Sequence, residues 1–225
     1  MCTVTFLPLA NDDFVLTSSR DVGFKREKSD IPKCYEESGV SLCYPKDGKA
    51  GGTWIGTSRN NRLICLLNGG FSNHKRKDVY PKSRGLIVKE LLVVEDFDHA
   101  CMKIDLAGIE PFTLVVVSWK EKLGLSEFVW DGQQRHLKKL VPGPFIWSSS
   151  TLYDDDMKLM RVNWFKEWMD TSDLSKESIL KFHKTAGIGS PDIDVFMKRD
   201  KVGTVSITQV IKGQELVEMN FEAFH

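Results

Sequence analysis

The first 23 residues alternate between apolar and polar positions with the two-residue period of half-buried β-strands. In "CTVTF", Cys2, Val4 and Phe6 alternate with two threonines, and "FVLTSS" resumes the pattern after the polar "NDD". Aspartate and asparagine favour tight turns because their side chains hydrogen-bond to the nearby backbone. The pattern therefore predicts a β-hairpin at the start of the chain.

The remaining chain shows strand-like and helix-like segments. Residues 23–50 are charged and contain prolines and glycines, so we expect an exposed excursion there. Helical spacing predicts a helical block over about 83–107 and two further helices in "DDDMKLMRVNWFKEWMD" and "SKESILKFHKTAG". Strands are expected around Trp54–Ile55, over Leu63–Leu67, at 112–118, 126–131, 134–140 and 144–148, and in "DIDVFMKRD", "GTVSITQVI" and "ELVEMNFEAF". The Asp-Gly pair of "WDGQQ" predicts a hairpin turn between the strands at 126–131 and 134–140.

The order of these elements indicates the fold class. Strands, helices, strands, helices and strands follow one another without a linker or an internal repeat. This order is typical of an α+β domain in which two mostly antiparallel sheets lie between helical layers. A chain of 225 residues is long enough to bury a substantial core. We therefore expect residues 1–225 to form one domain.

Composition and charge argue against several classes of protein. Lys plus Arg and Asp plus Glu both number 31, which disfavours a dedicated nucleic-acid or membrane-surface binder. The basic stretch "SNHKRKDVYPKSR" lacks an aromatic platform and is expected to be a solvated loop. No apolar run is long enough to span a bilayer, and the N-terminus does not read as a secretion signal. The scattered histidines favour neither a metal nor a cofactor.

The cysteines indicate a reducing environment. Cys2, Cys34, Cys43, Cys65 and Cys101 are odd in number and irregularly spaced. This spacing matches neither a disulfide framework nor the paired C-x-x-C clusters of zinc sites. We therefore expect a cytoplasmic protein in which Cys65 and Cys101 are inert core residues.

Cys2 would carry a thiol and a free α-amine on one residue if Met1 were removed. The reference pKa is about 7.7–8.0 for an α-amine and about 8.5 for a thiol, so the amine can take the thiol proton directly or through a water. The resulting thiolate would attack an amide or ester carbonyl without needing a catalytic histidine. The alternative is that Cys2 merely starts an edge strand, and the dipeptide alone favours that alternative.

Two further stretches carry groups that such a nucleophile needs. The predicted hairpin returns Arg20 and Asp21 of "SSRD" beside Cys2, where the aspartate would orient the α-ammonium and the arginine would hold the thiolate or a substrate carboxylate. Asn68 and Gly69 of "CLLNGG" offer an amide and bare backbone N–H groups for an oxyanion hole. The alternative for Arg20 and Asp21 is an ordinary surface ion pair. The alternative for Asn68 and Gly69 is a turn at the end of a strand.

Six pieces of the chain, taken in order, resemble the NRDE family, which is grouped with the N-terminal-nucleophile (Ntn) hydrolases. They are "MCTVTF", "LTSSRD", "AGGTWIG", "CLLNG", "IWSSSTLYD" and "TVSIT". The resemblance implies a four-layer αββα sandwich, in agreement with the element order. The cysteine branch of the superfamily includes bile salt hydrolases and penicillin V acylases. Its roles, carried over by position, imply Cys2 as nucleophile, Asp21 as the residue that orients the α-amine, Asn68 as an oxyanion donor and Arg20 as an assistant near the thiol.

The sequence departs from the family pattern at several positions. The signature Asn-Arg-Asp-Glu reads "SRDV" at residues 19–22. Ser148 of "WSSSTLY" stands where the acylase branch places an asparagine, and Lys201 stands where an arginine is expected before "TVSIT". We expect both residues, with Gly69, on the substrate-binding side of the site. Trp54 joins them because its flanking glycines allow close backbone approach.

Two functions of different classes fit these residues. The first is hydrolysis of a non-peptide amide, or an ester, of a small acylated substrate through a thioester on Cys2. The second is non-catalytic binding or trafficking of a lipid, acyl-CoA or haem, which the family resemblance suggests and the changed signature at Ser19 and Val22 favours. Substrate choice would depend on the pocket walls and on loop 69–83.

Overall fold

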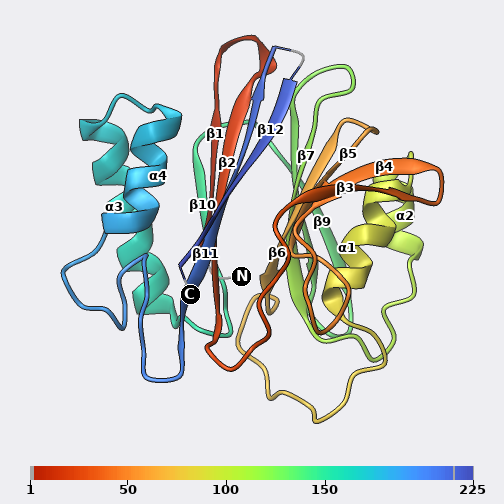
Figure 1. Ribbon diagram of the computed structural model, residues 1–225, viewed down its shortest axis with the longest axis horizontal. Coiled ribbons are helices and arrows are strands. Elements are labelled where there is room, and N and C mark those ends of the chain that lie inside the picture. The colour runs from red at the N-terminus through yellow and green to blue at the C-terminus, as the bar shows by residue number, and fades with distance from the viewer. Residues whose placement is uncertain (1–2, 215, 225) are drawn as a thin grey trace. The chain divides into compact units, whose positions relative to one another are not determined.

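The structure, a computed structural model, describes residues 3–214 and 216–224. The chain divides into two compact units, which we call the terminal unit (residues up to Arg26 and from Gly143 onward) and the inserted unit (Glu27–Pro142). Each unit is built on one antiparallel sheet and carries helices (Figure 1). The expectation that residues 1–225 form a single domain stays a prediction.

The terminal unit contains a five-stranded sheet in the order β10-β1-β2-β11-β12. Its neighbouring strands are all antiparallel within the described residues. Helices α3 and α4 lie side by side in the same unit (Figure 1). The bounds are β1 Thr3–Pro8, η1 Ala10–Asp12, β2 Phe14–Gly23, β10 Phe145–Ser148, α3 Asp155–Thr171, α4 Lys176–Thr185, β11 Val202–Gly213 and β12 Leu216–Ala223.

The predicted N-terminal hairpin is confirmed. β1 and β2 pair from Thr3 opposite Ser19 to Pro8 opposite Phe14, around the short turn η1. One face of the hairpin packs against the two helices, because its apolar residues meet an apolar stripe there. The buried residues of this cluster are Leu7, Val15, Phe165, Ile179, Phe182 and Val195.

The stretch "DIDVFMKRD" is not a strand, contrary to the sequence prediction. The backbone N–H groups of Ile193 and Asp194 both donate to the carbonyl of Ser190, which closes a tight turn where a strand ladder was expected. Val195 and Met197 are fully buried. The apolar alternation that resembled a strand therefore serves core packing in a folded loop.

The inserted unit contains a seven-stranded sheet in the order β3-β4-β5-β6-β7-β8-β9. Helix α1 packs on β5 and β6 through buried aliphatic residues such as Ile87 and Leu91. The predicted Asp-Gly hairpin between β8 and β9 is confirmed. The bounds are β3 Lys33–Glu37, β4 Val40–Tyr44, β5 Ile55–Ser58, β6 Arg62–Asn68, α1 Arg84–Val93, α2 Phe97–Lys103, β7 Phe112–Ser118, β8 Gly124–Trp130 and β9 Arg135–Leu140.

Residues 23–50 are not simply an exposed excursion, because they contain the β3–β4 hairpin. Its register places Cys34 directly opposite Cys43, with Cα atoms 4.0 Å apart, and the two sulfurs form a disulfide. The expectation drawn from cysteine spacing is therefore wrong for this pair, since a tight hairpin turn brings two irregularly spaced cysteines together. Cysteine usage no longer supports a reducing compartment, and the cytoplasmic location stays a prediction.

Two further observations concern the described residues as a set. No helix within residues 3–214 and 216–224 is long and apolar enough to cross a membrane. Over the same ranges, no three histidine, cysteine, aspartate or glutamate side chains are grouped closely enough to hold a metal ion together.

Gly52 and Gly85 lie where the "GGTWIG" segment touches the start of α1. A Cβ atom on Gly52 would lie 2.5 Å from the carbonyl carbon of Gly85, which is backbone and cannot rotate away. We expect Gly52→Ala to lower the free energy of unfolding by about 1–3 kcal/mol, measured by denaturant titration. Gly213→Ala is the matched control, because a Cβ there meets no atom within 4 Å. Equal effects of the two substitutions would contradict this packing role.

Candidate active site

The candidate residues of the terminal unit gather at the end of the sheet where β1 begins. Thr3 lies between two serines in the register, Ser19 of β2 on one side and Ser148 of β10 on the other. The predicted nucleophile Cys2 lies outside the described residues.

Asp21, near the end of β2, has the best-defined surroundings. It is 1% exposed. One carboxylate oxygen accepts a hydrogen bond from the Tyr153 hydroxyl at 2.7 Å, and the other accepts from the Thr204 hydroxyl at 2.6 Å. Hydrogen bonds to a charged acceptor at these lengths are strong. The two hydroxyls therefore fix the orientation of the carboxylate without adding a positive charge to it.

A β-bulge brings Thr204 to Asp21. The register of β11 on β2 shifts between Thr204 and Ser206, so that Thr204 lies opposite Asp21 while Ser206 lies opposite Arg20. A bulge inserts one residue and turns the following side chains to the other face of the ladder. The Thr204 hydroxyl also accepts from the Met197 N–H at 3.0 Å, which holds it in place.

A buried cation holds Tyr153 from the side of α3. The guanidinium carbon of Arg161 lies 3.6 Å from the centre of the Tyr153 ring. Arg161 is fully buried, and it donates to the carbonyl oxygen of Asp194 at 2.9 Å. Because aromatic faces attract cations, Arg161, Tyr153 and Asp21 form a chain that links a buried cation to a buried carboxylate through one phenol.

Removal of the Asp21 carboxylate tests this chain. We expect Asp21→Ala to lower the free energy of unfolding by about 2–4 kcal/mol, because the Tyr153 and Thr204 hydroxyls would be buried without their acceptor. Chemical denaturation of the Asp21→Ala and Tyr153→Phe single variants and of the double variant would measure their coupling, for which we expect about 1 kcal/mol or more. Strictly additive losses would contradict the hydrogen bond.

Arg20 and Asp21 point to opposite faces of the sheet, because side chains alternate along a strand. Arg20 is 4% exposed and lies opposite Ser206 in the register. Lys201 lies just before β11, and its carbonyl accepts from the Phe24 N–H at 3.1 Å while its side chain is exposed. The structure thus brings Arg20, Asp21 and Lys201 to one end of the sheet but does not place them on one face.

Ser19 is held by a histidine that the sequence analysis missed. His183 of α4 is fully buried, with Nδ1 2.8 Å from the Ser19 hydroxyl and Nε2 2.8 Å from the Thr5 hydroxyl. Burial lowers the pKa of His183 to about 3. The ring is therefore neutral at pH 7, and one nitrogen donates while the other accepts. The hydroxyl of Ser19, at the first position of the family signature, anchors α4 on the sheet.

Three candidate residues belong to the inserted unit. Asn68 ends β6 opposite Phe112 of β7. The N–H of Gly69 donates to the carbonyl of Pro111 at 3.0 Å, so the expectation of a bare N–H is wrong at this position. Gly69 has φ +86°, a left-handed conformation that favours glycine. Trp54 is 4% exposed and lies in the core, so its expected role in substrate binding stays a prediction.

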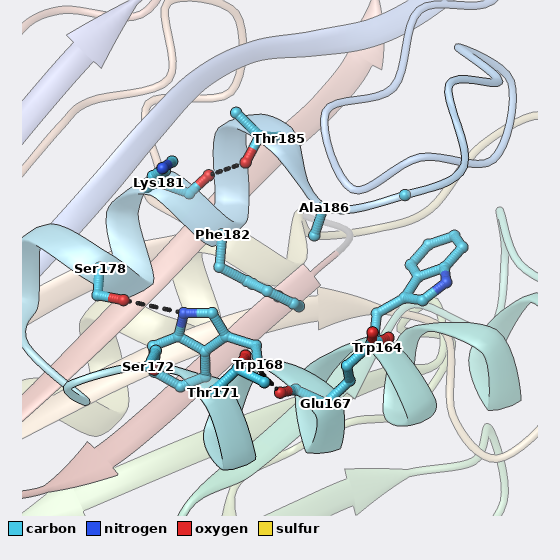
Figure 2. Close-up of a pocket in the computed structure, with 11 residues that line it drawn as sticks. Trp164, Glu167, Trp168, Thr171, Ser172, Ser178, Lys181, Phe182, Thr185 and Ala186 are labelled. Carbon is cyan, nitrogen blue, oxygen red and sulfur yellow. Dashed lines mark hydrogen bonds between the residues drawn. The ribbon is translucent and has the colours of Figure 1, made fainter.

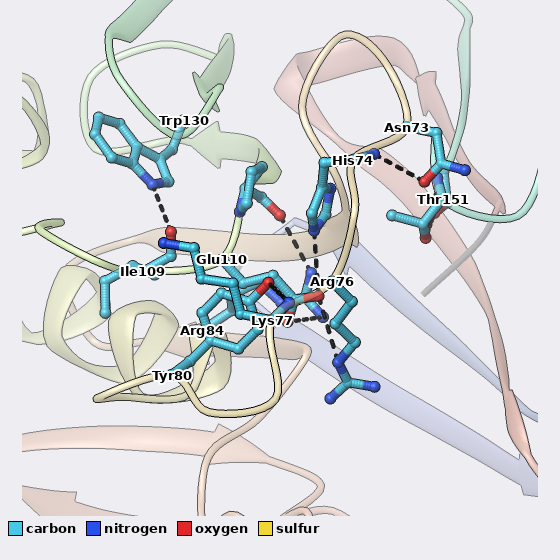
Figure 3. A network of polar contacts seen from close by, with 12 residues as sticks. Asn73, His74, Arg76, Lys77, Tyr80, Arg84, Ile109, Glu110, Trp130 and Thr151 are labelled. Atoms are coloured by element: carbon cyan, nitrogen blue, oxygen red, sulfur yellow. Dashed lines mark hydrogen bonds and ion pairs between the residues drawn. The ribbon is translucent and has the colours of Figure 1, made fainter.

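Loop 69–83, which follows Asn68, is anchored by Glu110 (Figure 3). A Glu110 carboxylate oxygen lies 3.3 Å from His74 Nε2 and 3.8 Å from Arg76 Nε, and the other lies 3.1 Å from Arg84 Nη2. Glu110 is 8% exposed. The prediction of a solvated loop is therefore incomplete, because part of its basic charge is bound to a nearly buried carboxylate from the segment before β7.

Three of the pieces that resemble a known family meet at Asp21. The aspartate lies in "LTSSRD", while its two hydroxyl donors lie in "IWSSSTLYD" and "TVSIT". The family model described as Transport and Golgi organisation 2 matches residues 1–200. The chain belongs to this family. The resemblance stated from the sequence is thereby confirmed, and the Transport and Golgi organisation 2 match includes every candidate residue except Lys201.

Solved structures similar to this family member are acylases and related hydrolases. The N-acylethanolamine-hydrolyzing acid amidase ortholog of Caenorhabditis elegans has a TM-score of 0.60 at 12% identity, over 93% of this chain and 92% of that chain. The conjugated bile acid hydrolase of Clostridium perfringens has a TM-score of 0.57 at 10% identity, over 99% and 92%. The penicillin V acylase of Agrobacterium tumefaciens has a TM-score of 0.53 at 10% identity, over 99% of this chain and 86% of that chain.

These likenesses establish the fold class. The two antiparallel sheets and their helices match the αββα sandwich of the Ntn hydrolases, as the sequence predicted. Identities this low show the fold alone. No curated protein is similar enough to count as a relative. The activity of the family member must therefore be argued from its own residues.

Proposed function

We propose that this protein is an N-terminal-cysteine amidohydrolase that cleaves a non-peptide amide, or an ester, of a small acylated compound. The observation that carries the proposal is the carboxylate of Asp21, which two hydroxyls orient at the end of the sheet where the chain begins. Family membership and the likeness to acylase structures support it.

The proposed reaction proceeds through a thioester. After removal of Met1, the α-amine of Cys2 takes the thiol proton, and Asp21 orients the ammonium that forms. The thiolate attacks the acyl carbonyl carbon, and the leaving amine takes a proton from the ammonium as the C–N bond breaks. A water then gives a proton to the α-amine, attacks the thioester, and releases the carboxylic acid and the thiol.

The remaining candidates have supporting roles in this proposal. The Asn68 amide would donate to the negatively charged oxygen of the tetrahedral intermediate, a contact made mainly in the transition state. Arg20 would hold the thiolate or a substrate carboxylate. Ser148, Lys201 and Trp54 are proposed to contribute to substrate binding.

N-terminal processing and thiol reactivity test the proposal together. Mass spectrometry should show that the mature protein lacks Met1, and iodoacetamide at pH 7 should modify one thiol and abolish hydrolysis of an N-acyl amide panel. The assay is selective, because the disulfide engages two cysteines while Cys65 and Cys101 are buried. Burial also raises the pKa of Cys101 to about 11. An active protein with intact Met1 would overturn the mechanism, since the base would be tied up in a peptide bond.

The second candidate function is non-catalytic binding or trafficking of a lipid, acyl-CoA or haem. The observation in its favour is that two positions that the sequence associated with the chemistry are used for folding. The Ser19 hydroxyl is bonded to His183, and the N–H of Gly69 is bonded to Pro111. Under this function, Cys2→Ala would leave ligand affinity and cellular function unchanged.

A further inference from the structure

Helices α3 and α4 form the walls of a groove of about 470 Å³ in the terminal unit (Figure 2). Most lining residues stand at positions 164, 167, 168 and 171 of α3 and at 178, 181, 182 and 185 of α4. Both sets have the spacing i, i+3, i+4, i+7, which places their members on one helix face. The volume is within the range of sites that bind small organic molecules.

Aromatic rings give the groove a preformed apolar surface. The Trp168 ring stacks on Phe165 with centres 5.5 Å apart, and it lies 5.8 Å from the centre of the Phe182 ring. Its Nε1 donates to the Ser178 hydroxyl at 3.1 Å, which fixes the ring further. Trp164, one turn earlier in α3, is the third aromatic side chain that lines the groove, after Trp168 and Phe182. A rigid surface of this kind binds a flat apolar group without a large ordering cost.

The threonine hydroxyls of the groove already donate to the helices. Thr171 donates to the carbonyl of Glu167 at 2.8 Å, and Thr185 donates to the carbonyl of Lys181 at 2.9 Å. Both bonds run within one helix, from a residue to the carbonyl four positions earlier. The groups best able to attract a polar ligand are therefore the charged ends of Glu167 and Lys181.

Glu167 and Lys181 put opposite charges on the two walls. Both side chains are exposed, and among the described residues neither has an ion-pair partner. Lys184, three residues after Lys181, differs in this respect, since it pairs with Glu222 at 2.6 Å. The groove thus offers a carboxylate from α3 and an ammonium from α4 beside one aromatic surface.

We propose that this groove binds a small zwitterion with an aromatic side chain, of the class of free aromatic amino acids. The ligand ammonium pairs with Glu167, its carboxylate pairs with Lys181, and its ring packs on Trp164 and Phe182. Exposed ion pairs contribute little each, so we expect a dissociation constant of about 1 mM. This site goes beyond the proposed hydrolysis and does not depend on it.

Three probes separate the two charges. L-phenylalanine carries both, N-acetyl-L-phenylalanine lacks the ammonium, and L-phenylalaninamide lacks the carboxylate. We expect L-phenylalanine to shift the NMR signals of the Trp164 and Trp168 indole N–H groups along a saturable curve. Each blocked probe should bind about threefold more weakly or worse. Absence of a saturable shift, or equal binding of all three probes, would overturn the proposal.

Matched variants assign each charge to its partner. With Glu167→Gln, L-phenylalanine and its N-acetyl derivative should bind alike, because the ammonium has lost its partner. With Lys181→Met, L-phenylalanine and its amide should bind alike for the corresponding reason. Lys184→Met should bind all probes as the wild type does, and a loss there would contradict the assignment. Cys2→Ala should also bind normally, so failure of the hydrolase proposal and failure of this one are distinguishable.

Discussion

Replacing Cys2 with alanine is expected to lower the turnover of a responsive N-acyl amide by at least ~10³-fold. Loss of a covalent nucleophile removes the path through the intermediate, and only binding and oxyanion stabilisation remain. The measurement is single-turnover hydrolysis by the processed protein, combined with mass spectrometry of the acyl-enzyme. The wild type should carry the acyl group on its N-terminal peptide, and the variant should carry none.

Two further variants make this prediction specific. Cys65→Ala removes a buried thiol elsewhere in the chain, so turnover should persist. Cys2→Ser keeps a nucleophile beside the α-amine and should retain more activity than Cys2→Ala. If Cys2→Ala hydrolysed the substrate as fast as the wild type, the thioester mechanism would be wrong. If the wild type were inactive but bound ligand as tightly as Cys2→Ala, the binding function would be favoured.

Lowering the pH from 7 to 5 is expected to remove about 2 kcal/mol of stability through His183 alone. The pKa of His183 is about 3 in the folded protein, whereas an exposed histidine titrates near pH 6.5. Below pH 6.5 the unfolded chain binds a proton that the folded chain does not. The contribution of His183 to the free energy of unfolding is therefore complete above about pH 6.5. Below that pH it falls by about 1.4 kcal/mol per pH unit until the pH reaches about 3.

The physical cause is burial beside neutral groups. Among the described residues, the two ring nitrogens of His183 hydrogen-bond to the neutral hydroxyls of Thr5 and Ser19, and a protonated ring would need both hydroxyls to act as acceptors without gaining a negative charge. Charging a buried group under these conditions is costly. Acid should therefore loosen the attachment of α4 to β1 and β2.

Urea titrations at pH 7, 6 and 5 on three proteins would check this prediction. His183→Gln should be less stable than the wild type at pH 7, because it fits the two hydroxyls less well. Below pH 6.5, the free energy of unfolding of this variant should fall by about 1.4 kcal/mol less per pH unit than that of the wild type. His99→Gln, an exposed position on α2, should follow the wild type. Parallel curves for the wild type and His183→Gln would show that His183 is not the responsible group.

Local sequence signals predicted the elements whose hydrogen bonds and burial are both local. The hairpin of β1 and β2, the helices α3 and α4, and the Asp-Gly turn between β8 and β9 follow from periodicity and turn chemistry within short windows. The polar start of α4 is equally local, since the Ser175 hydroxyl accepts from the Ser178 N–H three residues later. The strand prediction for "DIDVFMKRD" was wrong, because the alternation of apolar residues there arises from core packing of a folded loop.

The candidate site shows a similar division. Cys2, Arg20 and Asp21 were found from residue chemistry and a family resemblance, because nucleophile, base and charge partners have recognisable side chains. Tyr153 and Thr204 lay within quoted motif pieces, but their common acceptor could not be read from the chain. His183 and Arg161 stood on predicted helices without any signal of their own. The hydrogen bonds of Tyr153 and Thr204 to Asp21 join residues 132 and 183 positions apart. The contact of His183 with Ser19 joins residues 164 positions apart.

The sequence by itself determined the fold class, the hairpin that presents the N-terminus and the identity of the residues with reactive chemistry. These properties depend on periodicity and on side-chain type, which a linear chain displays. Only the tertiary structure decided that Asp21 is held by two hydroxyls, that Ser19 serves His183, that Gly69 has no bare N–H and that Cys34 meets Cys43. Each of these outcomes depends on register, on a bulge or on long-range packing, because a hydrogen bond or disulfide forms only where two distant groups are brought within a few ångströms.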